Sequence, residues 1–366
     1  MEPTVLLYYC YFPKPISSAD ADAMIAWQEE QASRLGLSGR VRVAFEGLNA
    51  NLSGPREAVD AYCAGLSAWR EGAVGGVDFK LAPTTAELEF RGLKVWLAKE
   101  VVALGAQVEP SQPGGRHVSP QEFHRILQEA QSGERPPGSV VLLDARNLYE
   151  TRLGRFEVPY QQNTDGSEAK PSGPVVQTYA PPTNNFTELP KYIDDLPAAM
   201  SSGCSSSLSG KTFLMYCTGG VRCERASQYL RAKHPEVGDV AQLSGGIHRY
   251  LESYADGGFW RGLNYVFDRR EVHGAMQGGD GTSEMIAACN TCAVPWASYK
   301  GKRRCGVCRA LVLVCDLCQS KGLDKKLLPQ GLICEVCQEM DFGGDEKSAK
   351  QKHAAVVGET ESPAVK

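Results

Sequence analysis

The spacing of apolar and polar residues over 4–105 predicts a mixed unit of strands and helices. Residues 40–45 alternate between polar and apolar side chains, which is typical of a half-buried strand, and apolar positions recur over 20–35 as on one helix face. Further strands are expected at 5–9, 49–53, 77–81 and 93–97, and a further helix at 55–69. The order βαββαβ, with an added strand, indicates a ferredoxin-like or acylphosphatase-like α+β domain.

A different pattern, in which apolar strands alternate with helices, begins at Ser119. Ser119 and Glu122 form a capping-box sequence that predicts the start of a helix. Residues 140–144 are almost continuously apolar, as expected for a strand buried on both faces of a parallel sheet. Further strands are expected at 212–216 and 240–243, each followed by a helix. This alternation predicts a doubly wound parallel sheet, so the chain is an α/β multidomain protein.

Polar segments divide the chain. A Pro/Gly-rich stretch that starts at Glu109 predicts a linker, and 161–210, with several prolines and a serine-rich run, predicts a long insertion in which only 189–200 is helical. The role of this insertion is left open. We expect an α+β domain at 1–108, a linker at 109–118, an α/β domain at 119–262, a cysteine-rich module at 263–342 and a disordered tail at 343–366.

Composition narrows the class of protein. The chain has 366 residues, of which 42% are hydrophobic, and no apolar run reaches the length of about 18 residues that a membrane span needs. The first twenty residues show no signal or transit peptide, so we expect no membrane, no secretory pathway and a cytoplasmic location, or a plastid if upstream residues are missing. The net charge of −4 does not by itself indicate a partner.

The candidate active site is the loop Cys217-Thr218-Gly219-Gly220-Val221-Arg222-Cys223, which lies between a predicted strand and a predicted helix. Its backbone N–H groups can converge on an anion above the thiol. The helix N-terminus and Arg222 favour the thiolate form of Cys217. Arg222 either balances charge within the loop, contacts a phosphate or is structural. Cys223 either resolves an oxidised Cys217 as a disulfide or packs as a small buried residue.

Other polar residues have two interpretations each. Asp144 and Arg146 follow a strand at the sheet edge where ligands bind in open α/β sheets, but an internal ion pair explains them equally well. Glu46 and Asn49 lie in a turn and either contact RNA or serve the turn. His248 is expected on a helix surface rather than in catalysis.

Thirteen cysteines are present, and eight form four C-x-x-C pairs. In a chain without a secretory signal, these pairs indicate metal binding in a reducing compartment. The spacing predicts two structural zinc sites with four thiolate ligands each, which leave no open position for catalysis. Sequential and crossed pairings both fit. The predicted ligands are Cys289, Cys292, Cys305, Cys308, Cys315, Cys318, Cys334 and Cys337.

Basic residues gather in the same module, and Trp296 and Tyr299 lie beside them in the sequence. A basic zinc module with aromatic neighbours suits contacts to the backbone and bases of RNA. The alternative is a solvated set of charges on a small domain. The candidate RNA contacts are Lys300, Lys302, Arg303 and Arg304.

Several motifs together resemble a known family. Residues 143–146, Glu150, Gly154, 216–217 and 245–247 resemble a rhodanese domain. The string YCTGGVRCERAS at 216–227 is similar to the tRNA uridine hydroxylase branch of rhodanese-domain proteins. Two further segments, FEGLNA at 45–50 and NYVFD at 264–268, resemble the same branch.

The resemblance implies oxygen-dependent 5-hydroxylation of the wobble uridine in tRNA, with molecular oxygen as co-substrate and Cys217 as the essential cysteine. We hypothesise that its thiolate adds to C6 of uracil and makes C5 electron-rich. The second candidate function is a sulfurtransferase that carries sulfur from thiosulfate or a persulfide on Cys217. The third is a non-enzymatic, zinc-dependent RNA-binding protein. The sequence does not identify the oxygen or sulfur donor, the tRNAs or the oligomeric state.

Overall fold

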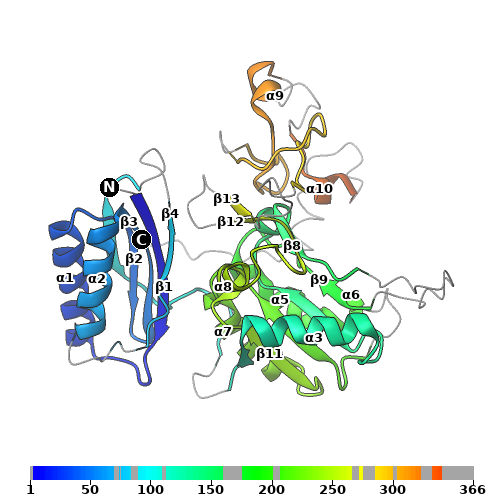
Figure 1. Ribbon diagram of the computed structural model, residues 1–366, viewed down its shortest axis with the longest axis horizontal. Coiled ribbons are helices and arrows are strands. Elements are labelled where there is room, and N and C mark those ends of the chain that lie inside the picture. Colours follow the sequence, from blue (N-terminus) through cyan, green and yellow to red (C-terminus); the bar gives the residue numbers. More distant parts are fainter. Residues whose placement is uncertain are drawn as a thin grey trace, which may run out of the picture.

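The computed structural model describes residues 3–69, 74, 76–83, 90–108, 113–159, 175–200, 207–265, 272–274, 285–299, 303–322 and 332–339. These residues form an N-terminal domain, a central domain and a C-terminal cysteine-rich module (Figure 1). Residues 161–174 and 201–206 of the expected insertion, and the whole expected tail, lie outside the described residues.

The N-terminal domain is an α+β sandwich. Its elements are β1 (Pro3–Tyr11), α1 (Ser18–Arg34), β2 (Ser38–Ala44), β3 (Gly47–Pro55), α2 (Arg56–Ala68), β4 (Lys80–Pro83) and β5 (Leu93–Leu97). The strands lie in the order β4-β1-β3-β2-β5, where β5 runs parallel to β2 and the other pairs are antiparallel. The acylphosphatase-like fold with an added strand is therefore confirmed.

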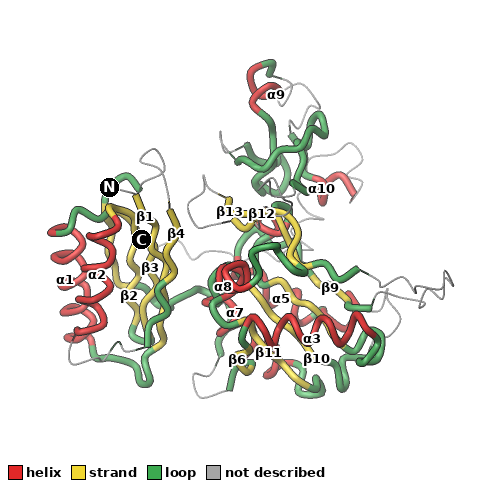
Figure 2. Tube along the Cα trace, in the orientation of Figure 1, coloured by secondary structure: helices red, strands yellow, loops and turns green. Residues whose placement is uncertain are grey.

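The two faces of this sheet have different neighbours because side chains alternate along each strand. Leu6 and Tyr8 of β1 are buried in the core that α1 and α2 cover. Leu7 and Tyr9 therefore lie on the opposite face, and the β1–β4 register places Lys80 directly beside Leu7. Figures 1 and 2 show both helices on the side of the sheet away from the central domain.

The central domain contains a five-stranded sheet in the order β6-β11-β10-β7-β9, with every neighbouring pair parallel. Its strands are β6 (Arg116–Val118), β7 (Val140–Asp144), β9 (Gln177–Tyr179), β10 (Thr212–Tyr216) and β11 (Asp239–Leu243). The strand β6 corrects the expected linker, because the last three residues of 109–118 belong to this sheet.

Helices cover both faces of the central sheet, which confirms the doubly wound arrangement. One apolar core lies under α3 (Pro120–Ser132) and α8 (Gly246–Ser253), and the other under α5 (Leu189–Asp194), α6 (Leu196–Met200) and α7 (Val221–Lys233). Ser119 caps α3 as expected, since its side chain accepts a hydrogen bond from the Glu122 N–H at 3.1 Å. The expected helix at 189–200 forms as α5 and α6, preceded by a short turn, η3 (Phe186–Glu188).

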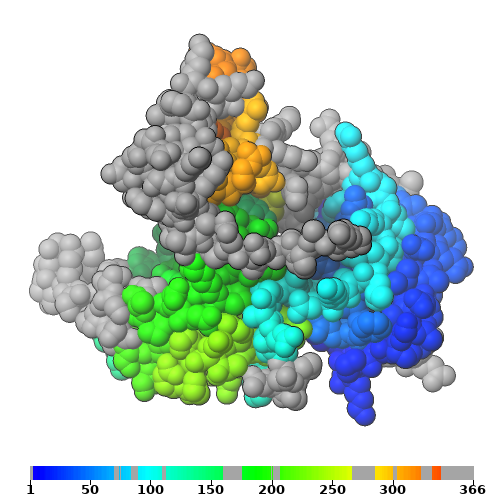
Figure 3. Space-filling view, turned by 180° about the vertical axis from the view of Figure 1, so that it is seen from behind, coloured from blue at the N-terminus to red at the C-terminus, as the bar shows by residue number. Residues whose placement is uncertain are grey.

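The remaining elements lie beside the central sheet or in the C-terminal part of the chain, where α9 and α10 belong to the cysteine-rich module. They are α4 (Leu148–Thr151), β8 (Gly154–Phe156), β12 (Trp260–Tyr265), β13 (Val272–Gly274), α9 (Asp316–Ser320) and α10 (Glu335–Glu339). Because β12 pairs with β8, it runs across the expected boundary between 262 and 263. Figure 3 shows the module over the central domain, beside the N-terminal domain. Among the described helices, none combines the length and the apolar character needed to cross a bilayer.

Candidate active site

Cys217 lies at the carboxyl end of β10, in a loop that turns directly into α7. Gly220 adopts a φ of 101°, which side chains other than glycine rarely tolerate, and so allows the sharp entry into the helix. In this conformation the Gly220 N–H donates a hydrogen bond of 3.1 Å to the Cys217 sulfur. The Cys217 side chain is fully buried. The expected strand-loop-helix geometry is therefore present.

The second helix that begins at this site, α8, holds the loop from the other side. Its first N–H groups, at Ile247 and His248, donate to the carbonyl oxygens of Cys217 and Thr218 at 3.0 and 3.2 Å. Gly246 permits this approach, since a Cβ there would lie 2.4 Å from the Cys217 oxygen. The His248 Nε2 lies 3.2 Å from a carboxylate oxygen of Glu252 on the same helix.

The loop stabilises the thiolate form of Cys217. Burial raises the pKa of this thiol, but the hydrogen bond from the Cys223 thiol, the charge of Arg222 and the backbone N–H groups of Arg222 and Gly220 together lower it to about 5. Burial and the neighbouring Cys217 thiolate raise the pKa of Cys223 well above its usual value. The two cysteines therefore form a thiolate–thiol pair at neutral pH, with Cys223 as donor.

Arg222 is held by a carboxylate that sequence reasoning noted only as part of a motif. Its guanidinium forms two hydrogen bonds with Glu150, of 2.6 and 2.7 Å, and both side chains are buried. Burial raises and the Arg222 charge lowers the pKa of Glu150, with a net decrease. The Thr218 hydroxyl also donates to Glu150, at 3.2 Å. Arg222 thus keeps its charge near Cys217 in a fixed orientation.

Asp144 and Arg146 form the internal ion pair that was one of their two interpretations. The Arg146 guanidinium lies 2.9 and 2.6 Å from the Asp144 oxygens, and both residues are buried. Arg146 also donates to the Gly154 carbonyl at 2.7 Å, and Thr151 donates to Asp144 at 2.9 Å. This cluster shapes the 144–154 segment that carries Glu150.

Side chains of the N-terminal domain contact the 217–223 loop, which the sequence did not predict. A Cβ on Gly219 would lie 3.0 Å from Leu7 and 3.9 Å from Lys80, and one on Gly220 would lie 2.7 Å from the Tyr9 hydroxyl. The only sequence signal was that Asp78 and Lys80 alternate with apolar Phe79 and Leu81, which placed Lys80 on the face away from the domain core.

Glu46 and Asn49 also lie at the contact between the domains. Glu46 accepts hydrogen bonds from the Val101 N–H and from Arg225 on α7, both at 2.9 Å. Asn49 donates to the Val101 carbonyl at 3.2 Å. Both side chains therefore hold the backbone at Val101, in the segment that follows β5.

A pocket of about 540 Å³ opens at the same contact. Four aromatic side chains line it, together with the paired groups of Glu46 and Arg225 and of His117 and Glu224. Phe45, which is 40% exposed, lies at its edge. The aromatic residues are Tyr9, Tyr11, Phe12 and Phe45. Since Tyr9 also lies against Gly220, the pocket adjoins the 217–223 loop.

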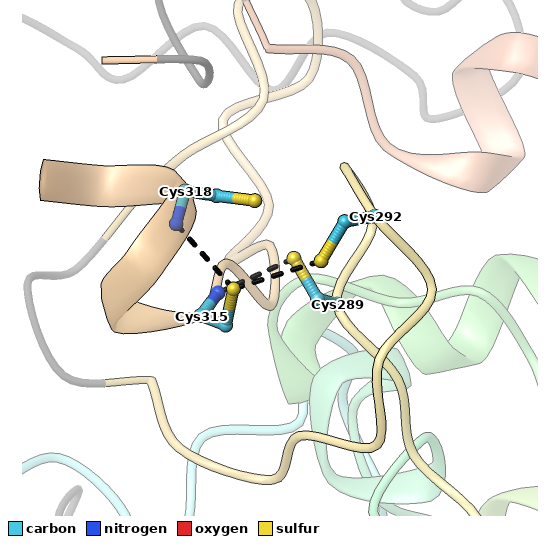
Figure 4. A group of neighbouring side chains, drawn as sticks. All are labelled: Cys289, Cys292, Cys315 and Cys318. Carbon is cyan, nitrogen blue, oxygen red and sulfur yellow. Dashed lines mark hydrogen bonds between the residues drawn. The ribbon is translucent and has the colours of Figure 1, made fainter. Parts of the chain in front are cut away.

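The eight cysteines form two clusters with crossed pairing. Cys289 and Cys292 join Cys315 and Cys318, whereas the other cluster contains Cys305, Cys308, Cys334 and Cys337. In Figure 4 the four sulfurs of the first cluster point toward one another, two from a loop and two from the start of α9. Ligand atoms within each cluster all lie within 4.8 Å of one another, so each cluster could hold a metal ion.

The donor set fits a tetrahedral ion. The Cys292 and Cys315 sulfurs are 3.7 Å apart, and the Cys308 and Cys334 sulfurs 3.5 Å. Four zinc–sulfur bonds of about 2.3 Å would separate the sulfurs by about 3.8 Å. Backbone N–H groups also point at sulfurs, as from Cys315 to Cys289 at 3.3 Å.

The candidate RNA contacts of this module are only partly described. Lys300 and Lys302 lie outside the described residues, Arg304 is exposed, and Arg303 is half-buried. Tyr299 does not serve as an exposed stacking residue. It is buried, packs against Tyr265 and donates to the Tyr149 carbonyl at 2.7 Å. This aromatic residue therefore attaches the module to the central domain.

Comparison with known proteins identifies two domain families and several relatives that match this chain. Residues 3–101 match the model of the UPF0176 acylphosphatase like domain, and residues 261–339 match that of the Rhodanase C-terminal family. A tRNA uridine(34) hydroxylase of an Arthrobacter species is 31% identical over 86% of this chain and 94% of its own length. One from Corynebacterium diphtheriae is 31% identical over 86% of this chain and 90% of its own.

A plant protein is similar over a larger share of the chain. Rhodanese-like domain-containing protein 6 of Arabidopsis thaliana is 36% identical over 93% of this chain, which spans 53% of the plant protein. The similarity to this relative therefore extends across all three described parts of the chain but covers about half of the plant protein.

Proposed function

The chain belongs to the tRNA uridine(34) hydroxylase family, and on that premise we propose that it hydroxylates uridine at position 34 of tRNA. The observation that carries the proposal is a buried cysteine, at the end of a parallel strand, whose pKa is lowered to about 5. A structural thiol needs no such environment, whereas a nucleophile does.

The proposed chemistry uses the thiolate as a covalent catalyst. Cys217 adds to C6 of the uracil, and the electron pair of the C5–C6 double bond moves onto the C4 carbonyl as an enolate. C5 is then nucleophilic and can form a bond to oxygen. With molecular oxygen as the oxidant, one atom enters C5, and an external thiol reductant supplies the two electrons and two protons that convert the other atom to water. Loss of the C5 proton then expels the Cys217 thiolate from C6 and restores the C5–C6 double bond.

Two roles remain for Cys223 in this scheme. Its high pKa keeps it as a thiol, so it stabilises the Cys217 thiolate by donating a hydrogen bond. If Cys217 becomes oxidised to a sulfenic acid, the adjacent thiol is positioned to form a disulfide with it. Under the first role Cys223 affects the rate of every turnover, and under the second it matters only after oxidation.

We also propose that each four-cysteine cluster binds zinc. Bound zinc would supply a structural crosslink, with every coordination position filled by thiolate, and no chemistry of its own. Cys289, Cys292, Cys315 and Cys318 would hold one ion, and Cys305, Cys308, Cys334 and Cys337 the other. The ions would thus hold together loops that otherwise share a small apolar core.

We propose that the aromatic pocket beside the loop binds part of the tRNA. Unpaired bases of RNA stack on aromatic side chains and form hydrogen bonds with nearby polar groups. Phe45 at the edge of the pocket and Tyr9 at the catalytic loop offer such contacts. We therefore assign the pocket to a base next to the target uridine. A tRNA substrate is compatible with the expected cytoplasmic location and with the plastid alternative, which both stay predictions.

A sulfurtransferase remains the second candidate. The observation in its favour is that the same N–H groups that stabilise a thiolate would also stabilise a persulfide on Cys217. Under this function, the chain would transfer sulfur from thiosulfate to a thiol acceptor without any tRNA.

Nucleoside mass spectrometry distinguishes the hydroxylase from the sulfurtransferase. tRNA from cells that lack their own hydroxylase should regain 5-hydroxyuridine when this chain is expressed, and should not when Cys217→Ser is expressed. Restoration by Cys217→Ser would remove the cysteine from the mechanism. If 5-hydroxyuridine stays absent while the purified protein transfers sulfur from thiosulfate, the second function replaces the first.

A further inference from the structure

Three side chains from the N-terminal sheet pack over the Cys217 loop. Leu7 and Lys80 are register partners on β1 and β4, and Tyr9 follows on the same face of β1. Leu7 and Lys80 lie against Gly219, and Tyr9 lies against Gly220. Cys217 has no exposed surface beneath them. The active site is therefore formed by two domains rather than by the central domain alone.

Lys80 differs from its two charged neighbours, Asp78 and Arg249, because it is buried. Its side chain is 1% exposed, whereas its partner Asp78 is 43% exposed and Arg249, which also binds Asp78, is 32% exposed. The Lys80 amine lies 2.7 Å from Asp78 and 5.4 Å from the centre of the Tyr9 ring. A lysine that only clamps two domains could stay at the rim with Arg249. Burial of an ammonium group is unfavourable unless negative charge lies nearby.

Asp78 supplies most of that negative charge, and the Cys217 thiolate of the loop adds to it. Arg222 stabilises the Cys217 thiolate through its charge but also forms an ion pair with Glu150, so Cys217 shares this cation with a carboxylate. Burial lowers the pKa of Lys80, while the charges of Asp78 and of Cys217 oppose this decrease. Lys80 and Cys217 therefore interact electrostatically across the domain contact.

We propose that Lys80 is a catalytic residue of the active site, contributed by the N-terminal domain, whose ammonium group binds the anionic oxygen that forms on uracil when Cys217 adds. In this step the sulfur–C6 bond forms, the C5–C6 π pair moves to the C4 oxygen, and an N–H of Lys80 donates a hydrogen bond to that oxygen. No proton or electron leaves the enzyme–base adduct. This inference rests on the proposed hydroxylation.

The placement of the cation is tested without tRNA. Alkylation of Cys217 by iodoacetate, which is anionic, is compared with alkylation by neutral iodoacetamide. A cation beside the sulfur raises the iodoacetate rate selectively, so Lys80→Met should lower the ratio of the two rates roughly ten-fold. Lys80→Arg keeps the charge and should restore most of the ratio. An unchanged ratio in Lys80→Met, in a protein with wild-type circular dichroism, would overturn the inference.

Lys94→Met is the matched control. Lys94 lies on β5 of the same domain, over the ring of Trp96 at 5.4 Å, and so also makes a cation–aromatic contact, but it is exposed. Its loss should leave both alkylation rates unchanged. An equal decrease of the ratio in this variant would attribute the effect to the net charge of the domain and not to Lys80.

The catalytic role is tested by the kinetics of 5-hydroxyuridine formation. Loss of a hydrogen-bond donor to a developing oxyanion lowers kcat by about 100-fold, so Lys80→Met should have this effect with little change in KM for tRNA. A rise in KM with unchanged kcat would refute the role in catalysis. If the wild-type protein forms no 5-hydroxyuridine although the alkylation ratio depends on Lys80, the proposed function fails and the position of the cation stands.

Discussion

The guanidinium of Arg222 and the carboxylate of Glu150 form a buried ion pair, with two hydrogen bonds of 2.6 and 2.7 Å, directly beneath the loop that carries Cys217. Glu150 also accepts a hydrogen bond from the Asn147 N–H at 3.1 Å and so caps the start of α4. The pair holds the Arg222 guanidinium in one orientation and links the segment after β7 to the start of α7.

Glu150→Gln should therefore destabilise the protein strongly. It leaves the Arg222 charge buried without its carboxylate, which costs about 3–5 kcal/mol in the free energy of unfolding. Chemical denaturation of wild type and variant measures the difference. Asp60→Asn is the control, because its ion pair with Arg56 is more than half exposed on both sides and should contribute under ~0.5 kcal/mol. Equal losses in the two variants would contradict the structural role of Glu150.

The reactivity of Cys217 should depend on pH with a midpoint of about 5. The thiolate is the reactive form, so the rate of alkylation by iodoacetamide rises with pH through the pKa and is constant above it. Peptide mass spectrometry identifies the labelled cysteine, and Cys217→Ser should lose the label. A midpoint near that of an ordinary thiol, at about 8.5, would show that the loop does not stabilise the anion.

Cys223 should contribute to the low pKa of Cys217. Cys223→Ala removes a hydrogen bond that lowers the pKa of Cys217, so the midpoint of the alkylation profile should move to higher pH. Cys223→Ser keeps a donor of similar size and should leave the midpoint closer to that of wild type. If the alanine variant titrates as wild type does, Cys223 does not donate to the thiolate.

The metal content should be about two zinc ions per chain, by elemental analysis of freshly purified protein. Crossed pairing places Cys289 and Cys315 in one cluster and Cys305 in the other. The double variant Cys289→Ser/Cys315→Ser should thus retain one ion, whereas Cys289→Ser/Cys305→Ser should lose both. The reverse result would indicate sequential pairing, and no zinc in wild type would refute the metal assignment.

Phe45→Ala should weaken tRNA binding without affecting chemistry. Loss of one aromatic stacking partner raises KM for tRNA roughly ten-fold, with kcat nearly unchanged. Leu97→Ala is the control, since Leu97 is a similarly exposed apolar residue of the same domain, at 45% against 40% for Phe45, outside the pocket. Equal KM values for the two variants would exclude the pocket from RNA binding.

The sequence by itself determined many of the elements and the strand-loop-helix setting of Cys217. Alternation in β2, the apolar runs of β7 and β10, and the Ser119 cap are local signals, because each depends on residues a few positions apart. The glycines and cysteines of the 217–223 loop likewise specify a strand-loop-helix turn within a short segment. Such signals can be interpreted without knowledge of distant contacts.

Only the tertiary structure decided which distant residues meet. Glu150 reaches Arg222 and Lys80 reaches the Cys217 loop because separate elements pack together, and no local pattern records such a pairing. The C-x-x-C spacing likewise allowed sequential and crossed clusters, and the path of the chain between the pairs selected the crossed arrangement. Tyr299, which the sequence placed beside a candidate RNA-binding surface, is instead buried and donates a hydrogen bond to the Tyr149 carbonyl.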